Sequence, residues 1–111
     1  MIKLEMKLND NQIISEANHT PQEIYDALDK VFSKYGFKKI VLPDGTISYS
    51  GTGANTDYGS FANIILFLKN KDWFVPYVEK WLWYNSDDGE DENDYAVEDI
   101  LLHYTNRRSV A

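Results

Sequence analysis

The order of apolar and polar residues predicts several short strands. Residues 2–8 alternate strictly between apolar and charged or polar side chains, which is the period of a strand with one buried face. Residues 37–42 and 47–50 are two extended runs on either side of the turn-forming sequence at 43–46, and they predict a hairpin. After a turn at Asn9-Asp10-Asn11, residues 12–16 favour a short additional strand.

A helix is expected after Thr20. Thr20 occupies the N-cap, Pro21 the first helical position and Glu23 the third. The side chains of Thr20 and Glu23 can therefore each accept a hydrogen bond from a backbone N–H that has no partner within the helix. Gly36 supplies a left-handed residue that ends the helix. The apolar residues recur at helical spacing and are Ile24, Leu28, Val31, Phe32 and Tyr35.

Two further helices are predicted in the second half of the chain. One begins at Asp57 or Ser60, either of which can cap it, and ends near Asn70. Another covers residues 95–104, with Arg107-Arg108 at its C-terminus, where cations complement the helix dipole. The core residues expected on the first two helices are Leu28, Val31, Phe32, Phe61, Ile64, Ile65 and Leu68.

The segment 78–84 is expected to be the last strand, with Trp81 and Trp83 on one face. The order is then strand, helix, hairpin, helix, strand, helix. This order predicts a small α+β domain in which about three helices pack on an antiparallel or mixed sheet of about four strands. The length of 111 residues fits a single domain over residues 1–111.

Charge is distributed unevenly along the chain. The sequence has 18 acidic and 11 basic residues, for a net charge of −7, and residues 86–99 contain acidic residues but no Lys or Arg. The acids of this segment are Asp87, Asp88, Glu90, Asp91, Glu92, Asp94, Glu98 and Asp99. A run of like charges repels itself, so it indicates either an interaction surface or a solvated loop that only keeps the protein soluble.

Composition excludes several classes of protein. Cysteine is absent, which rules out disulfides, thiolate catalysis and cysteine-based zinc sites. The longest apolar run is 64–68, far short of the ~20 residues that a spanning helix needs. Residues 1–5 lack the apolar stretch of a signal peptide. We therefore expect a cytoplasmic protein that does not contact membranes.

The motifs that resemble catalytic or ligand sites are incomplete. The Gly51-Thr52-Gly53 sequence lacks the lysine of a phosphate loop and the third glycine of a dinucleotide site. If a calcium-binding loop began at Asp87 or Asp88, its sixth position, where glycine is needed, would be Glu92 or Asn93. His19 and His103 have no sequence-local nucleophile or metal-ligand partner. The sequence therefore predicts no enzyme activity, no catalytic or metal-binding residues and no cofactor.

The aromatic side chains near 73–84 could stack on the bases of single-stranded nucleic acid. Cations are scarce there, and the adjoining charge of the acidic segment repels phosphate, so direct nucleic-acid binding is disfavoured. Core packing is expected for most of these rings. Trp81 and Trp83 remain candidates for a partner-binding anchor, because tryptophan is common at interface hot spots.

Several stretches resemble one group of proteins. These stretches are 2–8, Asp72-Trp73-Phe74, 81–88 and 98–104. They are similar to small acidic proteins carried on conjugative elements and plasmids of Gram-positive bacteria. Such elements also encode inhibitors of host defence, including anti-CRISPR and antirestriction proteins that resemble nucleic acid by their surface charge, so the resemblance implies that class of function.

Two hypotheses follow from these observations. In the first, the acidic residues of 86–99 dock into a basic groove of a nucleic-acid-handling protein. In the second, the chain is an accessory or immunity-type adaptor that binds a protein partner through Trp81 and Trp83, with the acids serving only to steer association. Salt separates the two, because a charge-driven complex weakens with ionic strength more than an aromatic one.

Overall fold

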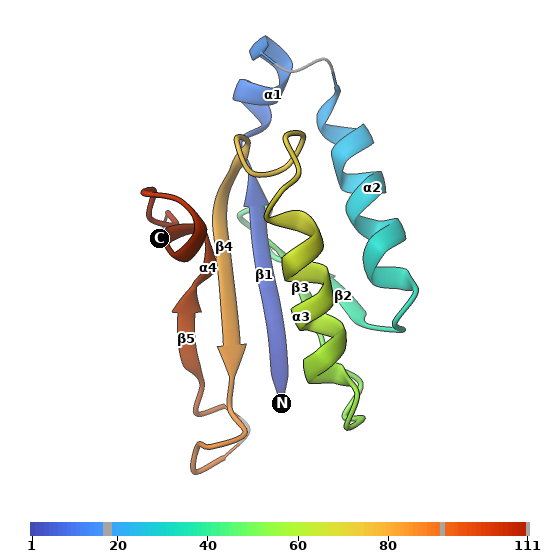
Figure 1. Ribbon diagram of the computed structural model, residues 1–111, viewed down its shortest axis with the longest axis vertical. Helices are drawn as coiled ribbons and strands as arrows, with labels where there is room; N and C mark the ends of the chain where they lie inside the picture. Colours follow the sequence, from blue (N-terminus) through green and yellow to red (C-terminus); the bar gives the residue numbers. More distant parts are fainter. Residues whose placement is uncertain (17–18, 92, 111) are drawn as a thin grey trace.

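The computed structural model describes residues 1–16, 19–91 and 93–110, and these residues form an α+β fold (Figure 1). The strands are β1 (Ile2–Leu8), β2 (Lys38–Val41), β3 (Ile47–Ser50), β4 (Val78–Asn85) and β5 (Ala96–Asp99). The helices are α1 (Asp10–Glu16), α2 (Pro21–Ser33), α3 (Asp57–Leu68) and α4 (Ile100–Tyr104). The predicted fold class is confirmed, with one strand and one helix more than expected in the described part.

The sheet has the order β2-β3-β1-β4-β5, and every neighbouring pair of strands is antiparallel. The long strands β1 and β4 lie side by side in its centre. Leu4 of β1 lies between Tyr49 of β3 and Trp83 of β4, and Met6 lies between Ile47 and Trp81. The apolar residues of the alternating N-terminal pattern therefore share one face of the sheet, as predicted.

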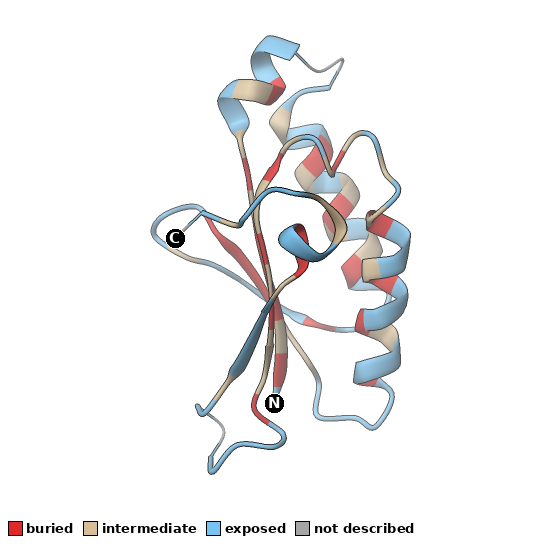
Figure 2. Ribbon diagram, turned by 60° about the vertical axis from the view of Figure 1, so that its left-hand side comes forward, coloured by how far each residue is buried: buried red, intermediate tan, exposed pale blue. Residues whose placement is uncertain are grey.

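Helices α2 and α3 cover this apolar face of the sheet. The ring of Phe32 in α2 stacks on Tyr49, with 3.8 Å between centroids, and Phe61 in α3 meets Trp83 edge-on at 5.2 Å. In Figure 2, buried residues line the strands and the sides of the helices that face them. Of the predicted core residues, Val31 and Ile65 are only partly buried, and the buried ones are Leu28, Phe32, Phe61, Ile64 and Leu68.

Local capping explains where α2 begins. The Thr20 hydroxyl accepts a hydrogen bond from the Glu23 backbone N–H, and the Glu23 carboxylate accepts one from the Thr20 backbone N–H. The predicted capping box is therefore confirmed. The start of α3 differs from the prediction: its N-cap is Thr56, and Asp57 is the first helical residue instead of the cap.

Residues 12–16 form part of helix α1, so the predicted short strand is wrong. The side-chain oxygen of Asn9 accepts a hydrogen bond from the Gln12 N–H at 3.1 Å, and the Asn9 carbonyl accepts one from the Ile13 N–H. An asparagine that caps in this way starts a helix where sequence pattern favours a turn and a strand. Ile13 is buried, whereas Ile14 is 72% exposed.

The end of the chain also differs from its prediction. Residues 96–99 pair with β4 as strand β5, and the helix is only 100–104 instead of 95–104. Arg107 does not act at the end of that helix. Its guanidinium donates to the carbonyl oxygen of Val78 at 3.1 Å and to that of Val75, where the chain enters β4.

Among the described residues, no helix is both long enough and apolar enough to cross a bilayer.

Candidate functional site

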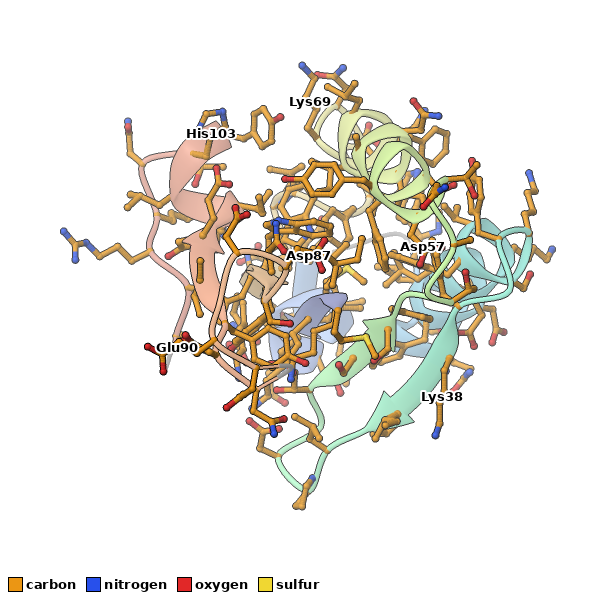
Figure 3. The ribbon with its side chains drawn as sticks, turned by 90° about the horizontal axis from the view of Figure 1, so that it is seen from below. Lys38, Asp57, Lys69, Asp87, Glu90 and His103 are labelled. Atoms are coloured by element: carbon orange, nitrogen blue, oxygen red, sulfur yellow. The ribbon has the colours of Figure 1, made fainter. Side chains whose placement is uncertain are left out.

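The acidic segment forms the long connection between β4 and β5. We call residues 86–95 the acidic loop; it lies at the end of the molecule shown at the bottom of Figure 1. The described carboxylates with exposed residues in this loop are those of Asp87, Asp88, Glu90, Asp91 and Asp94. Glu92, also predicted to bind a partner, lies outside the described residues. Figure 3 shows Glu90 pointing outward, on the opposite side of the molecule from Lys38.

Both ends of the acidic loop are attached to the sheet. At its start, Ser86 donates from its backbone N–H and its hydroxyl to the Met1 carbonyl oxygen, at 2.9 and 3.1 Å. At its end, the Tyr95 ring meets Tyr84 edge-on at 5.7 Å, and the Lys3 ammonium lies over both rings, 4.8 and 4.7 Å from their centroids. The Met1 ammonium also forms an ion pair with the Asp87 carboxylate at 2.6 Å. The loop is therefore held in place by hydrogen bonds, aromatic and cation–π contacts and one ion pair.

Two of the carboxylates also shape the loop. Asp91 accepts a hydrogen bond from the Asn93 N–H at 2.7 Å, and Asp94 accepts one from the Glu90 N–H at 3.0 Å. At Gly89, a Cβ atom would collide with the main-chain oxygen of Asp94, so the close approach of these segments requires glycine. The loop consequently has an internal hydrogen-bonding pattern.

Glu98 and Asp99 have different roles. Glu98 is exposed, whereas the Asp99 carboxylate accepts hydrogen bonds from the Ser109 hydroxyl at 2.7 Å, the Ser109 N–H at 2.9 Å and the Leu102 N–H at 3.2 Å. Burial raises the pKa of Asp99, but these hydrogen bonds outweigh burial and hold the pKa below its usual value. Asp99 therefore caps α4 and fastens the C-terminal segment, which contradicts its predicted role in presenting charge to a partner.

Trp81 and Trp83 belong to the core. Trp81 is 0% exposed and packs edge-on against Phe74 at 5.1 Å, while Trp83 is 8% exposed. Both point to the sheet face that the helices cover, because both share the alternation of Leu4 and Met6. The predicted partner-binding role is therefore wrong for Trp81, and Trp83 exposes too little surface to form an aromatic patch. Their burial follows from the two-residue period of a strand, which puts Trp81 and Trp83 on the same face as Leu4 and Met6.

One edge of Trp83 nevertheless lines a groove of about 270 Å³ between α3 and α4. We call it the Trp83 groove; its lining includes Tyr58, Ala62, Leu66, Glu98, His103 and Tyr104. Figure 3 shows His103 of α4 and Lys69, the residue after α3, on the same side of the molecule. No pattern in the sequence predicted this groove. The nearest signal was that α3 is apolar on more than one side.

The glycine-rich loop before α3 binds a carboxylate of its own chain. Asp57 is buried and accepts hydrogen bonds from the Thr52 hydroxyl at 2.6 Å and the Gly53 N–H at 2.8 Å. Burial raises the pKa of Asp57, but these hydrogen bonds outweigh it and keep the pKa below its usual value. The backbone donor of Gly53, which would otherwise suit an anion, is thus used by Asp57.

The two histidines are on the surface. The Nδ1 atom of His19 lies 3.4 Å from a Glu23 carboxylate oxygen, and His103 is exposed beside Tyr104. Within residues 1–16, 19–91 and 93–110, no group of three or more His, Asp or Glu side chains is arranged to hold a metal ion. No family model, curated protein or solved structure matches the chain.

Proposed function

We propose that the chain is a non-enzymatic binding protein that presents its acidic loop to a basic groove of a nucleic-acid-handling protein, as an inhibitor of the anti-CRISPR or antirestriction type. The carboxylates of the loop take the place of the phosphates that such a groove normally binds. The partner is thus a protein, and the chain itself does not bind nucleic acid.

The observation that carries the proposal is the exposure of Asp87, Asp88, Glu90, Asp91 and Asp94 on one anchored loop. No Lys or Arg occurs between Lys80 and Arg107. The Met1 ammonium pairs with Asp87 at 2.6 Å, so Asp88, Glu90, Asp91 and Asp94 are the described carboxylates of the loop that we assign to the partner. Concentrated charge of one sign steers association with a surface of the opposite sign and raises the rate of encounter.

The arrangement of the loop supports the proposal in a second way. Holding like charges close together costs free energy, and a loop whose only role is solubility needs no fixed geometry. Here Ser86 and Tyr95 attach the two ends, and Asp91 and Asp94 form turns inside. A partner then meets charges that are already placed, which lowers the entropy cost of binding.

The proposal is tested by affinity capture from a bacterial lysate, using two variants of equal charge. One carries Asp88→Asn, Glu90→Gln and Asp91→Asn, which keep a side-chain acceptor oxygen at each position. The matched control carries Glu16→Gln, Asp26→Asn and Asp72→Asn, which change exposed acids elsewhere. Each variant removes three negative charges.

We expect the wild type and the control to retain the same proteins, enriched in nucleic-acid-binding proteins. Duplex DNA should displace them, because DNA and the loop compete for the same cations. The loop variant should lose them, and added salt should weaken the wild-type complex steeply. If the loop variant retains the same proteins with the same salt dependence, the acidic loop is not the binding surface.

A further inference from the structure

The end of the Trp83 groove near β5 combines aromatic rings with a carboxylate. The Tyr58 ring meets Trp83 edge-on, with 5.6 Å between centroids and an interplanar angle of 82°. Glu98 lies directly opposite Trp83 in the β4–β5 register and lines the same groove. Two ring systems from different elements and one acid therefore meet at one place.

The size of the groove limits what it can hold. Small-molecule sites usually measure about 300 to 1,000 Å³, and this groove is about 270 Å³. Ala62 and Leu66 of α3 add apolar surface to its wall. A space of this size and polarity accommodates one long side chain with an apolar stem.

The charge of the groove selects a cation. Among the described residues, its lining contains no Lys or Arg and one carboxylate, that of Glu98; the imidazole of His103 also lines it, edge-on to the Tyr104 ring at 4.6 Å. Lys69 lies over the Tyr104 ring, 5.3 Å from the centroid, so that ring already has a cation of the same chain. The Tyr58 and Trp83 rings, which lie next to Glu98, are therefore the ones that can contact a cation of another molecule.

We propose that Tyr58, Trp83 and Glu98 bind an arginine side chain of the protein partner. A guanidinium group is planar, so it can stack on the exposed Tyr58 ring beside the Trp83 edge and pair with the Glu98 carboxylate through two N–H groups. A lysine ammonium is a compact charge without a planar face and cannot stack in this way. The methylene stem packs against Ala62 and Leu66. The inference rests on the proposed function for the identity of the partner, a nucleic-acid-handling protein, but the pocket can be tested without that partner.

The probe is the blocked tripeptide acetyl-Gly-Arg-Gly-amide, added to the full chain while its NMR spectrum is recorded. We expect a saturable shift of the Trp83 indole N–H signal. The same peptide with citrulline in place of arginine has nearly the same shape but no charge, and it should give no saturable shift. The lysine peptide should bind more weakly, because it lacks the planar group that stacks.

Three variants locate the site. Ala62→Trp fills the groove from an exposed helix position and should weaken arginine-peptide binding by about tenfold or more, whereas Asn63→Trp, at the adjacent exposed position, should not. Glu98→Gln should raise the dissociation constant by about threefold, as expected for an ion pair near the surface. The acidic-loop variant should bind the tripeptide as the wild type does, so failure of the pocket and failure of the loop are distinguishable.

The proposal is wrong if the arginine peptide causes no saturable Trp83 shift, or if the Ala62→Trp protein still shows it. Equal binding of the citrulline peptide would show that charge is not recognised. Equal binding of the lysine peptide would exclude selection for the guanidinium group.

Discussion

Among single residues, Asp57 connects the glycine-rich loop to α3, and its ionisation should affect stability. Its pKa is below the usual 3.8 in the folded protein, so its contribution to stability is complete above that value and is lost as the pH falls through the folded pKa. Asp57→Asn should lower the free energy of unfolding by about 1 to 3 kcal/mol near neutral pH.

Urea unfolding between about pH 5 and pH 2 measures this contribution. The Asp57→Asn protein should lose less stability over this range than the wild type, because the charged acceptor is already gone. Asp72→Asn, which changes an exposed acid, is the control and should follow the wild-type curve. Parallel curves for wild type and Asp57→Asn would show that Asp57 is not a source of the acid sensitivity.

Two glycines should respond in opposite ways to the same substitution. At Gly51 a Cβ atom would lie 2.7 Å from the Asp57 carboxylate, whereas at Gly59 a Cβ atom would have no neighbour within 4 Å. Gly51→Ala should therefore destabilise the protein by about 1 to 3 kcal/mol. Gly59→Ala, inside α3, should stabilise it by about 0.5 to 1 kcal/mol. Denaturant midpoints of the two proteins on the same side of the wild type would contradict this assignment.

For whole elements, α3 should be the helix whose packing matters most, because it covers the centre of the sheet. Ile64 is 1% exposed, and Phe67 on the same helix is 44% exposed. Ile64→Ala should cost about 2 to 5 kcal/mol, as expected for removing methyl and methylene groups from a packed core. Phe67→Ala should cost much less. Chemical denaturation measures both, and equal losses would mean that α3 does not present Ile64 to the sheet.

At the scale of the whole molecule, the acidic loop should contribute to function but little to stability. Its described carboxylates are exposed, and the hydrophobic core lies mainly between the helices and the sheet (Figure 2). The variant with Asp88→Asn, Glu90→Gln and Asp91→Asn should melt at the same temperature as the wild type or higher, because like-charge repulsion is relieved. Added salt should stabilise the wild type more than this variant, since salt screens the same repulsion.

Thermal melts at low and high salt test this expectation, with the Glu16→Gln, Asp26→Asn, Asp72→Asn protein as control. The acids of the control are dispersed, so their removal should change the salt response less. A large loss of stability in the loop variant would instead assign the loop a structural role.

Much of the fold was predictable because its signals are local. The strict alternation of 2–8, the capping motif at 20–23 and the turn at 43–46 each act within a few residues, and the structure has the expected strand, helix and hairpin at these positions. The helix α1 was missed because a single cap at Asn9 outweighs a weak strand pattern. The strand β5 was missed because a strand at the edge of a sheet depends on its neighbour β4 more than on its own sequence.

The position of the functional residues was only partly predictable. Residue order alone shows that the acids of 86–99 are concentrated and have no Lys or Arg among them. Which of these acids face solvent depends on how the chain folds. The tertiary structure placed Asp99 among hydrogen-bond donors and buried Trp81, because contacts from Ser109 and from the helices are distant in sequence. It also created the Trp83 groove, since no local pattern brings Tyr58 of α3 to Glu98 of β5.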